Sequence, residues 1–354
     1  MGAYIDPHVH LRDGRQAHKE TIRHGLLVAY DSNVAAILDM PNTDPAVTTR
    51  EVVEDRLRLA RDAGVPGVFY GLFMGATADP EQLREAVEVC REVPQVVGLK
   101  LYAGTSVGDL AVIREEDQRR VYAVLAAAGY DGVLAVHCEK ESHFRPVWTP
   151  DLPASHCLAR PEEAEVASVR DQLAFSREEG YRGKLHIAHV SSPQAVELVA
   201  QAREGGMDVS SGVCPHHLVY DWRAMEGEAG IRMKMNPPLR SPASRLKLLE
   251  QLHAGKIDWI ETDHAPHTLD EKTNPQRGCP SGVPGLAWWP LFEEFLRRQE
   301  FSGRKIGRLT FTNAAERFGL DLQAKEVFFV DHRAEYAFDP YVSLEREIGW
   351  PPRY

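Results

Sequence analysis

The sequence has 354 residues, of which 43% are hydrophobic and 26% charged, a composition typical of a globular protein long enough to bury a large core. Its net charge of −11 disfavours nucleic acids and anionic membrane surfaces as partners, because both bind to basic surfaces. The five cysteines include no C-x-x-C pair, no apolar stretch approaches the ~18 residues of a membrane span, and no secretory signal pattern occurs, so we expect a cytoplasmic protein.

Eight short apolar runs rich in valine, isoleucine and leucine recur along the chain, and most of them are separated by stretches with helical periodicity. The runs are residues 3–10, 34–40, 67–73, 96–102, 132–138, 184–190, 207–213 and 257–263. Between the second and the third, residues 48–64 place apolar side chains on one helical face, and Gly64 is a stop signal. Apolar strands that alternate with helices predict a parallel sheet covered on both faces, and eight of them predict an α/β fold of the TIM (β/α)8 barrel type.

An open, doubly wound sheet is the alternative to the barrel. No G-x-G-x-x-G motif follows the first predicted strand, which disfavours the dinucleotide-binding form of such a sheet. We therefore divide the chain into a catalytic barrel, residues 1–319, and a C-terminal extension packed on it, residues 320–354. Within the extension, residues 326–339 predict one or two strands beside the barrel.

Polar residues stand at the C-terminal ends of the predicted strands, where the catalytic groups of a barrel collect. His8 and His10 end the first strand and, being two residues apart, point to the same face. Later strand ends carry Asp39 with Asn42 behind it, Lys100, His137, His186, His189, Asp263, His264 and His267. Each residue alone is explained as well by a core histidine, a helix cap or a lysine that extends from a strand end. Their coincidence at one mouth of the barrel predicts a divalent transition-metal site of four imidazoles, one carboxylate and one lysine.

Lys100 needs a chemical modification to act as a metal ligand, because a protonated ammonium group cannot coordinate a cation. Reaction with carbon dioxide would give a carbamate, an anionic oxygen ligand that can bridge two metals. Burial lowers the pKa of a lysine and makes this reaction feasible.

Seven segments together resemble the amidohydrolase superfamily and, within it, the dihydroorotases. They are DPHVHLRDG (6–14), DMPNTDP (39–45), GLKLYAGTS (98–106), AVHCE (135–139), HIAHVSS (186–192), MNPPLR (235–240) and ETDHAPH (261–267). The resemblance extends from Asp6 to residues 312–320, which is nearly the whole chain.

This resemblance implies a site with two zinc ions. His8 and His10 would hold the more buried zinc, and His137 and His189 would hold the second. Carboxylated Lys100 would bridge the two ions.

The resemblance also implies roles for four further residues. Asp263 would contact the first zinc and act as general base and general acid. Arg12, Asn42 and His267 would bind the carboxylate of the substrate, for which the planar guanidinium of Arg12 offers a fork of donors.

The sequence departs from the family pattern at two places. Related enzymes often carry a threonine-bearing loop after the lysine that closes on substrate, whereas Thr105 and Ser106 stand in a shorter loop here. The few residues before Asp6 imply a short form without an N-terminal β-sandwich segment, whereas HVSS, MNPPLR and TDHAPH look more like the long enzymes. The subclass therefore stays open.

Other polar residues are weaker candidates for the metal and substrate site. We expect His216 and His217 to have a structural role or to lie behind the metal ligands, and Cys138 to lie in the core. His186 would point away from His189 on a regular strand, so we leave it out of the ligand set. Residues 279–285 (CPSGVPG) predict a substrate loop and an ordinary Pro/Gly turn equally well.

The activity implied by the resemblance is reversible hydrolysis of a cyclic amide, the interconversion of L-dihydroorotate and N-carbamoyl-L-aspartate in pyrimidine biosynthesis, by a homodimer. A hydantoinase- or allantoinase-type amidase is the nearest alternative, although Arg12 and His267 favour an acid-bearing substrate. A catalytically inactive homologue that acts as a scaffold would be marked by lost ligands, and no expected ligand position is missing from the sequence.

Overall fold

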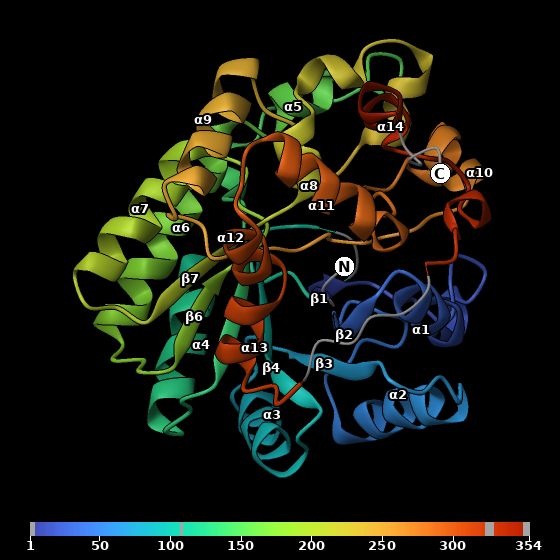
Figure 1. The fold of residues 1–354 in the computed structure, drawn as a ribbon. Coiled ribbons are helices and arrows are strands. Elements are labelled where there is room, and N and C mark those ends of the chain that lie inside the picture. Colours follow the sequence, from blue (N-terminus) through green and yellow to red (C-terminus); the bar gives the residue numbers. More distant parts are fainter. Residues whose placement is uncertain (1–3, 107–108, 323–328, 350–354) are drawn as a thin grey trace.

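The strands form one parallel sheet whose order follows the sequence, in a computed structural model that describes residues 4–106, 109–322 and 329–349 (Figure 1). The strands are β1 (Tyr4–Val9), β2 (Val34–Asp39), β3 (Phe69–Gly75), β4 (Val96–Ala103), β5 (Val133–Cys138), β6 (Lys184–Ile187), β7 (Val209–Val213) and β8 (Trp259–Ile260). Each strand pairs with the next one in parallel. All eight predicted strands are therefore confirmed, although β6 and β8 are shorter than predicted.

The sheet closes on itself between β1 and β8 through a short contact. The backbone N–H of His10 donates to the carbonyl of His264 (2.8 Å), and Val9 forms a parallel bridge with His264. Asp6 on β1 also accepts hydrogen bonds from the backbone N–H (3.1 Å) and the hydroxyl (2.6 Å) of Thr262. A side chain thus replaces part of the ladder that the two-residue β8 does not supply. The strands form a nearly closed barrel, which confirms the predicted TIM (β/α)8 fold over the open sheet.

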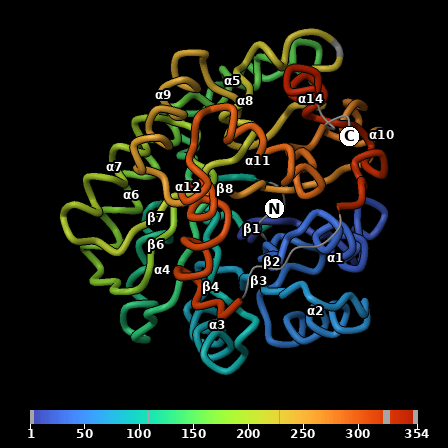
Figure 2. Tube along the Cα trace, viewed as in Figure 1, coloured from blue at the N-terminus to red at the C-terminus, as the bar shows by residue number. Residues whose placement is uncertain are grey.

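Helices surround the barrel on its outside (Figures 1 and 2). The longer helices are α1 (Ile22–Asp31), α2 (Arg50–Asp62), α3 (Pro80–Glu92), α4 (Glu115–Ala127), α6 (Glu162–Glu178), α7 (Pro193–Glu204), α9 (Pro242–His253) and α11 (Trp289–Arg298). The shorter helices are α5 (Ser155–Ala159), α8 (Pro215–Val219), α10 (Leu269–Thr273), α12 (Gly303–Gly307), α13 (Asn313–Phe318) and α14 (Val342–Ile348). The helix predicted within residues 48–64 is α2, where the Thr49 hydroxyl caps the N-terminus and Gly64 adopts a φ of 66° just beyond the C-terminus.

Side chains of the strands alternate between the barrel interior and the layer beneath the helices. Leu99 and Leu101 of β4 belong to the large apolar cluster between strands and helices, so Lys100 between them faces the interior. Cys138 belongs to the same outer cluster, as predicted, which places it on the opposite side of β5 from His137. The inward positions at the carboxyl ends of the strands therefore carry the polar residues.

The described part of the C-terminal segment, residues 329–349, contains a 3-10 turn (Arg333–Glu335) and α14, so the prediction of strands there is wrong. Residues 326–328 of the predicted stretch lie outside the described residues. A barrel whose strands pair with one another offers no long free edge to a further strand. The segment is instead anchored by aromatic side chains, because Tyr341 packs on Phe292 (ring centroids 4.8 Å apart) and the Tyr336 hydroxyl donates to Glu20 (3.1 Å). The division of the chain at Gly319 stays a prediction.

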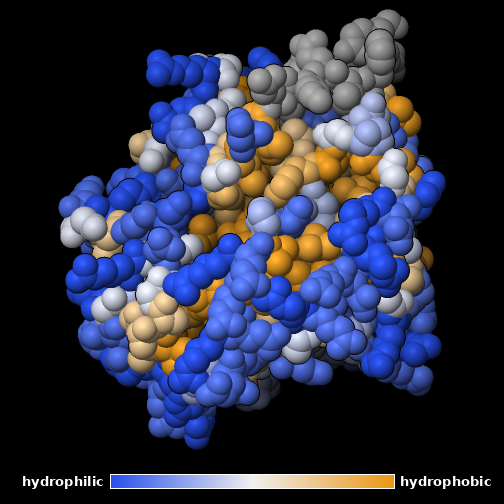
Figure 3. Space-filling view, turned by 90° about the horizontal axis from the view of Figure 1, so that it is seen from below, coloured by the Kyte–Doolittle hydropathy of each residue, from blue (hydrophilic) through white to orange (hydrophobic). Residues whose placement is uncertain are grey.

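One face of the molecule combines a polar periphery with an apolar centre (Figure 3). Figure 3 shows one face of the molecule, where hydrophilic side chains dominate the periphery and hydrophobic residues gather in a central band. No helix in the described ranges combines the length and the apolar character that crossing a membrane requires.

Candidate active site

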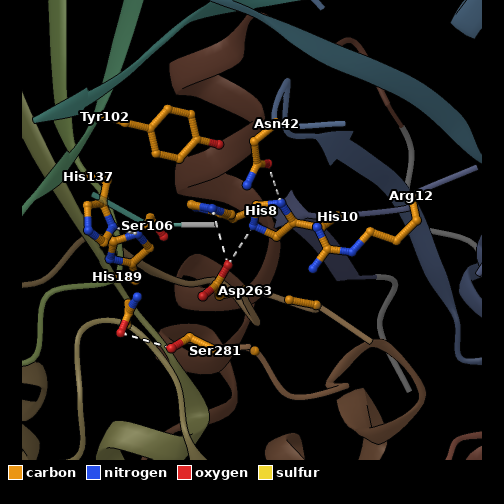
Figure 4. Close-up of a pocket in the computed structure, with 13 residues that line it drawn as sticks. His8, His10, Arg12, Asn42, Tyr102, Ser106, His137, His189, Asp263 and Ser281 are labelled. Carbon is orange, nitrogen blue, oxygen red and sulfur yellow. Dashed lines mark hydrogen bonds and ion pairs between the residues drawn. The ribbon is translucent and has the colours of Figure 1, made fainter. Parts of the chain in front are cut away.

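A polar pocket lies at the carboxyl ends of the strands (Figure 4). It is lined by His8, His10, Arg12, Asn42, Tyr102, Ser106, His137, His189, Asn236, Asp263, Ala265, Ser281 and Gly282. Seven of the nine residues predicted for the site therefore line one pocket. The two exceptions are Lys100 and His267, which are buried close to it.

His8, His10 and Asp263 form the tightest cluster in the pocket. The Nε2 atoms of His8 and His10 lie 3.4 Å and 2.9 Å from Oδ1 of Asp263 (Figure 4). One ligand atom from each of the three residues lies within 4.8 Å of the others. His8 on β1 and His10, one residue beyond its end, point to the same face as their spacing predicted, and the segment after β8 supplies the carboxylate.

His137 and His189 face each other beside this cluster. Nδ1 of His137 is 3.2 Å from Nε2 of His189, and the ring centroids of His8 and His189 are 5.1 Å apart. All four imidazoles are buried, and burial followed by the charge of Lys100 lowers the pKa of His8 to about 4. Neutral imidazoles are the form that coordinates metals.

Lys100 is completely buried without a counter-ion at contact distance among the described residues. Its Nζ atom has no hydrogen-bond partner and lies 5.2 Å from the centroid of the Tyr102 ring. Burial lowers the pKa of Lys100 to about 8. A lysine in this state supplies the neutral amine that reacts with carbon dioxide.

The donor set fits a divalent transition-metal centre. Nδ1 of His8, Nδ1 of His189 and Nζ of Lys100 are buried and have no hydrogen-bond partner. Leaving such an atom unsatisfied costs about 1–3 kcal/mol, so three of them around one pocket argue for a ligand that uses them. Imidazoles and carboxylates are ligands that zinc prefers.

The backbone is strained at three of the pocket residues. Arg12, His189 and Asp263 adopt φ angles of 41°, 40° and 49°, in the left-handed region that side chains other than glycine rarely occupy. Strain of this kind persists only where the surrounding structure holds it, and it concentrates at functional sites. These three side chains are therefore aimed into the pocket by backbone conformations that the barrel enforces.

The three predicted carboxylate-binding residues have different positions. The Arg12 guanidinium lines the pocket, and its Nε and Nη1 atoms are buried without a hydrogen-bond partner. Asn42 also lines the pocket, and its Oδ1 atom lies 2.7 Å from Nδ1 of His10. His267 does not line the pocket. Its Nε2 atom lies 3.1 Å from the Ser281 carbonyl and 3.3 Å from Nη2 of Arg12.

Buried carboxylates behind the pocket orient its histidines, and sequence analysis missed this layer. Glu261 accepts hydrogen bonds from the His189 backbone N–H (2.5 Å), the Trp259 indole (2.9 Å) and Nε2 of His186 (3.2 Å). His186 is thus turned to Glu261 and not into the pocket, which agrees with its exclusion from the ligand set. Glu139 similarly lies 3.1 Å from Nε2 of His137. Hydrogen-bonded carboxylates fix the ring orientation of metal-binding histidines.

Two loops complete the walls. Ser106 lines the pocket, whereas the Thr105 backbone N–H donates to Glu141 (2.7 Å), and residues 107–108 of the predicted closing loop lie outside the described residues. In the second loop, residues 279–285, Ser281 and Gly282 line the pocket. Of the two interpretations of that loop, its position favours contact with substrate.

Tyr102 and Asn236 are pocket residues that the sequence analysis did not single out. Tyr102 lies two residues beyond Lys100 on β4, so strand alternation could have revealed it. Its hydroxyl is buried and has no hydrogen-bond partner. Asn236 was quoted only within a motif, and its Oδ1 atom lies 2.9 Å from Nε2 of His156.

His216 and His217 lie outside the pocket, as predicted. Nε2 of His217 is 3.0 Å from the Pro237 carbonyl, and Nδ1 of His216 is 3.5 Å from the Tyr341 hydroxyl. With Cys214 they form a second group of possible ligand atoms within 4.8 Å of one another. Their hydrogen bonds connect α8 to two other segments, which supports a structural role.

Comparison with known proteins gives a consistent picture. No family model matches the chain. The sequence is 30% identical over 360 residues to a dihydroorotase of Brevibacillus brevis, covering 98% of this chain and 82% of the relative. It is 32% identical over 371 residues to a dihydroorotase of Methanosarcina mazei (99% and 79% covered) and 34% identical over 326 residues to one of Halobacterium salinarum (90% and 71% covered).

Solved structures with the same fold include hydantoinases and a dihydropyrimidinase. The L-hydantoinase of Arthrobacter aurescens matches with a TM-score of 0.78 at 23% identity, covering 94% of this chain and 74% of that one. The dihydropyrimidinase of Brevibacillus agri matches with a TM-score of 0.76 at 23% identity, covering 91% and 71%. At this identity the likeness supports the barrel fold alone.

Proposed function

Since the chain belongs to the dihydroorotase family and is a hydrolase of cyclic amides, we propose that its substrate is L-dihydroorotate, which it interconverts with N-carbamoyl-L-aspartate. The observation that carries this proposal is the position of Arg12. Its guanidinium is buried in the pocket, close to His10 and Asp263, with two nitrogen atoms that have no hydrogen-bond partner. A buried, unpaired guanidinium is matched by a carboxylate, and dihydroorotate carries one that takes no part in bond cleavage.

We propose that His8, His10, His137, His189 and Asp263 would hold two zinc ions, with Lys100, once carboxylated, as a further ligand. When bound, such ions supply Lewis acidity, which polarises a carbonyl group and lowers the pKa of water. The unsatisfied buried atoms of His8, His189 and Lys100 support this assignment.

In the reaction, water adds to the ring carbonyl carbon, the amide C–N bond breaks, and the nitrogen takes up a proton. Asp263 is the carboxylate that lines the pocket, and burial raises its pKa, so it is suited to take a proton from water and pass it to the leaving nitrogen. Arg12 and Asn42 bind the spectator carboxylate, and His267 supports Arg12. The Tyr102 hydroxyl offers one further donor to the bound ring. These contacts hold the scissile carbonyl in position for attack.

A hydantoinase or allantoinase activity is the second candidate function. The hydantoinases among the structural neighbours keep this alternative open, but a ring without a carboxylate would leave Nε and Nη1 of Arg12 without a partner. An inactive scaffold is disfavoured, because every predicted ligand is present in the sequence.

One assay separates these functions. The zinc-reconstituted protein is given dihydroorotate, hydantoin and allantoin at equal concentration, and we expect the highest kcat/KM with dihydroorotate. Preference for a neutral ring would identify the amidase alternative, and no turnover of any ring would identify a scaffold. We also propose that the protein is a cytoplasmic homodimer. Sedimentation of the purified protein tests the oligomeric state.

A further inference from the structure

A larger chamber adjoins the metal pocket. Its volume is about 340 Å³, and it shares Ser106, Asn236 and Ser281 with the pocket wall. The segment between β5 and α6 contributes one wall of this chamber, and the loops that contain Lys234 and Ser281 contribute the other. The shared residues make the chamber and the metal pocket direct neighbours.

The chamber carries an excess of positive charge. Three basic residues line it, Arg145, Arg160 and Lys234, and its described lining includes no aspartate or glutamate. The molecule as a whole has a net charge of −11, so this concentration of cations runs against the overall balance. Cations gathered in a cavity with protein walls attract anions more strongly than they would on an open surface.

Lys234 is a cation without a carboxylate partner in the described part of the chain. Its Nζ atom donates to the Cys279 carbonyl (2.7 Å) and lies 4.8 Å from the centroid of the Trp148 ring. Both partners are uncharged, and an ammonium group has three N–H donors. Burial, followed by the charges of Lys234 and Arg160, lowers the pKa of His156 to about 3.

The other two basic residues differ in whether a carboxylate neutralises their charge. Arg160 pairs with Glu139 (2.5 Å), and its guanidinium stacks 4.4 Å from the centroid of the Phe144 ring. Arg145 is exposed and has no salt bridge among the described residues. The chamber is thus lined by two cations without a carboxylate partner among the described residues, Lys234 and Arg145, and by the rings of Trp148 and Phe144, which lie beside Lys234 and Arg160.

We infer that this chamber is an anion-selecting vestibule, which binds the carboxylate of an incoming acid-bearing cyclic amide before the ring enters the metal pocket. The inference rests on the proposed function in taking an acid-bearing ring as the substrate. The vestibule is separate from Arg12, which holds the carboxylate in the final complex. Lys234 and Arg145 are specificity-determining residues of this vestibule, and they take no part in bond cleavage.

The test removes the charges and follows binding separately from chemistry. Lys234→Met, Arg145→Met and the double variant are assayed with dihydroorotate at increasing ionic strength. We expect kcat/KM of the double variant to fall about tenfold at low salt and to lose most of its salt dependence, with kcat nearly unchanged. Lys247→Met is the matched control for each single variant. Lys247 is exposed on α9, and its replacement removes one positive charge, as each single substitution does.

Unchanged kcat/KM and unchanged salt dependence in the double variant would overturn the inference. Arg145 is exposed, so Arg145→Met keeps the test valid even if Lys234→Met disturbs folding. If the wild type does not turn over dihydroorotate, the proposed function fails and the vestibule is judged by calorimetry with N-carbamoyl-L-aspartate. Weaker binding by the variants would then support the vestibule, and equal affinity would overturn it.

Discussion

Arg12 and His267 are in direct contact, with Nη2 of the guanidinium 3.3 Å from Nε2 of the imidazole. The same imidazole nitrogen lies 3.1 Å from the Ser281 carbonyl, and in a neutral ring it either accepts from Arg12 or donates to this carbonyl, so His267 packs between the arginine and the loop that walls the pocket. Burial lowers the pKa of His267 to about 3, which keeps the ring uncharged beside the guanidinium. The positive charge available to a substrate at this point therefore comes from Arg12, and His267 positions it.

Replacement of Arg12 should impair recognition of the acid and leave the metal centre intact. We expect Arg12→Lys and Arg12→Ala to keep fold and zinc, and Arg12→Ala to lose about 100-fold in kcat/KM for dihydroorotate, because a charge-assisted pair contributes about 1.5–3 kcal/mol. Steady-state kinetics with dihydroorotate and with dihydrouracil, which lacks the carboxylate, measure the difference. Arg15→Ala is the control, since Arg15 is exposed and pairs with Asp44 (3.0 Å). Equal losses on both rings would show that Arg12 supports the structure of the site and does not recognise the acid.

The proposed metal content is directly measurable. Protein reconstituted with zinc and freed of excess metal should contain about two zinc ions per chain, because the proposed ligands, four imidazoles, one carboxylate and carboxylated Lys100, are more than one zinc ion uses. Mass spectrometry of digested protein gives the stoichiometry, and activity is followed on the same samples. Full activity at one ion per chain would rule out the bridged centre.

Lys100→Ala should lose zinc and activity together. The carbamate would supply oxygen ligands to both ions, and an alanine supplies none. Short carboxylic acids such as acetate should restore part of both properties, because their oxygens replace those of the carbamate. Lys184→Ala, a change at another strand lysine, should have little effect on zinc content. An alanine variant of Lys100 that is fully active without added acid would refute the bridging role.

The sequence predicted the barrel and most of the pocket because strand alternation is local. His8, His10 and Lys100 could be placed from spacing alone, and the same argument could have included Tyr102. The carboxylates behind the pocket could not be found in this way. Glu261 meets the His189 backbone 72 positions earlier in the chain, a contact that only the closed barrel creates.

One prediction failed because its outcome depends on contacts between distant segments. The C-terminal segment has a strand-like composition, but the paired barrel leaves it no sheet edge, and its aromatic residues pack as isolated anchors. The role of His267 in binding the substrate stays a prediction, since its ring lies beside Arg12 and the loop at Ser281.

Acid should destabilise the metal-free protein in a defined pH range. Burial, followed by the charges of Lys234 and Arg160, lowers the pKa of His156 to about 3, compared with about 6.5 in an unfolded chain. Between these values the unfolded chain binds a proton that the folded chain does not. The free energy of unfolding therefore decreases by about 1.4 kcal/mol per pH unit for this histidine as the pH falls from about 6.5 toward 3.

Urea unfolding of the metal-free protein between pH 7 and pH 4 measures this dependence. His156→Gln should flatten the slope, because glutamine keeps a donor and does not titrate. His18→Gln is the control, since His18 is exposed. A slope that His156→Gln leaves unchanged would show that other groups account for the acid sensitivity.

Lys272 holds the loop of residues 279–285 against the pocket. Its side chain is completely buried on α10, and its Nζ atom donates to the carbonyls of Lys234 (2.8 Å), Pro280 (3.0 Å) and Gly282 (2.8 Å). Three acceptors match the three N–H donors of an ammonium group. Since Gly282 lines the pocket, this clamp fixes one wall of the substrate site from behind.

Lys272→Met should therefore weaken both the fold and substrate binding. Methionine fills the space but leaves the Pro280 and Gly282 carbonyls without this donor, whereas the Lys234 carbonyl keeps the backbone N–H of Gly282 (2.9 Å), so we expect a loss of about 3 kcal/mol in the free energy of unfolding. We also expect KM for dihydroorotate to rise more than kcat falls, because the wall loosens while Asp263 and the histidines keep their own supports. Urea unfolding and steady-state kinetics measure the two effects. Lys256→Met removes an ammonium that pairs with Glu197 at the surface, and it should change stability by less than about 1 kcal/mol. A Lys272→Met protein with unchanged stability and unchanged KM would mean that the loop keeps its position without the clamp.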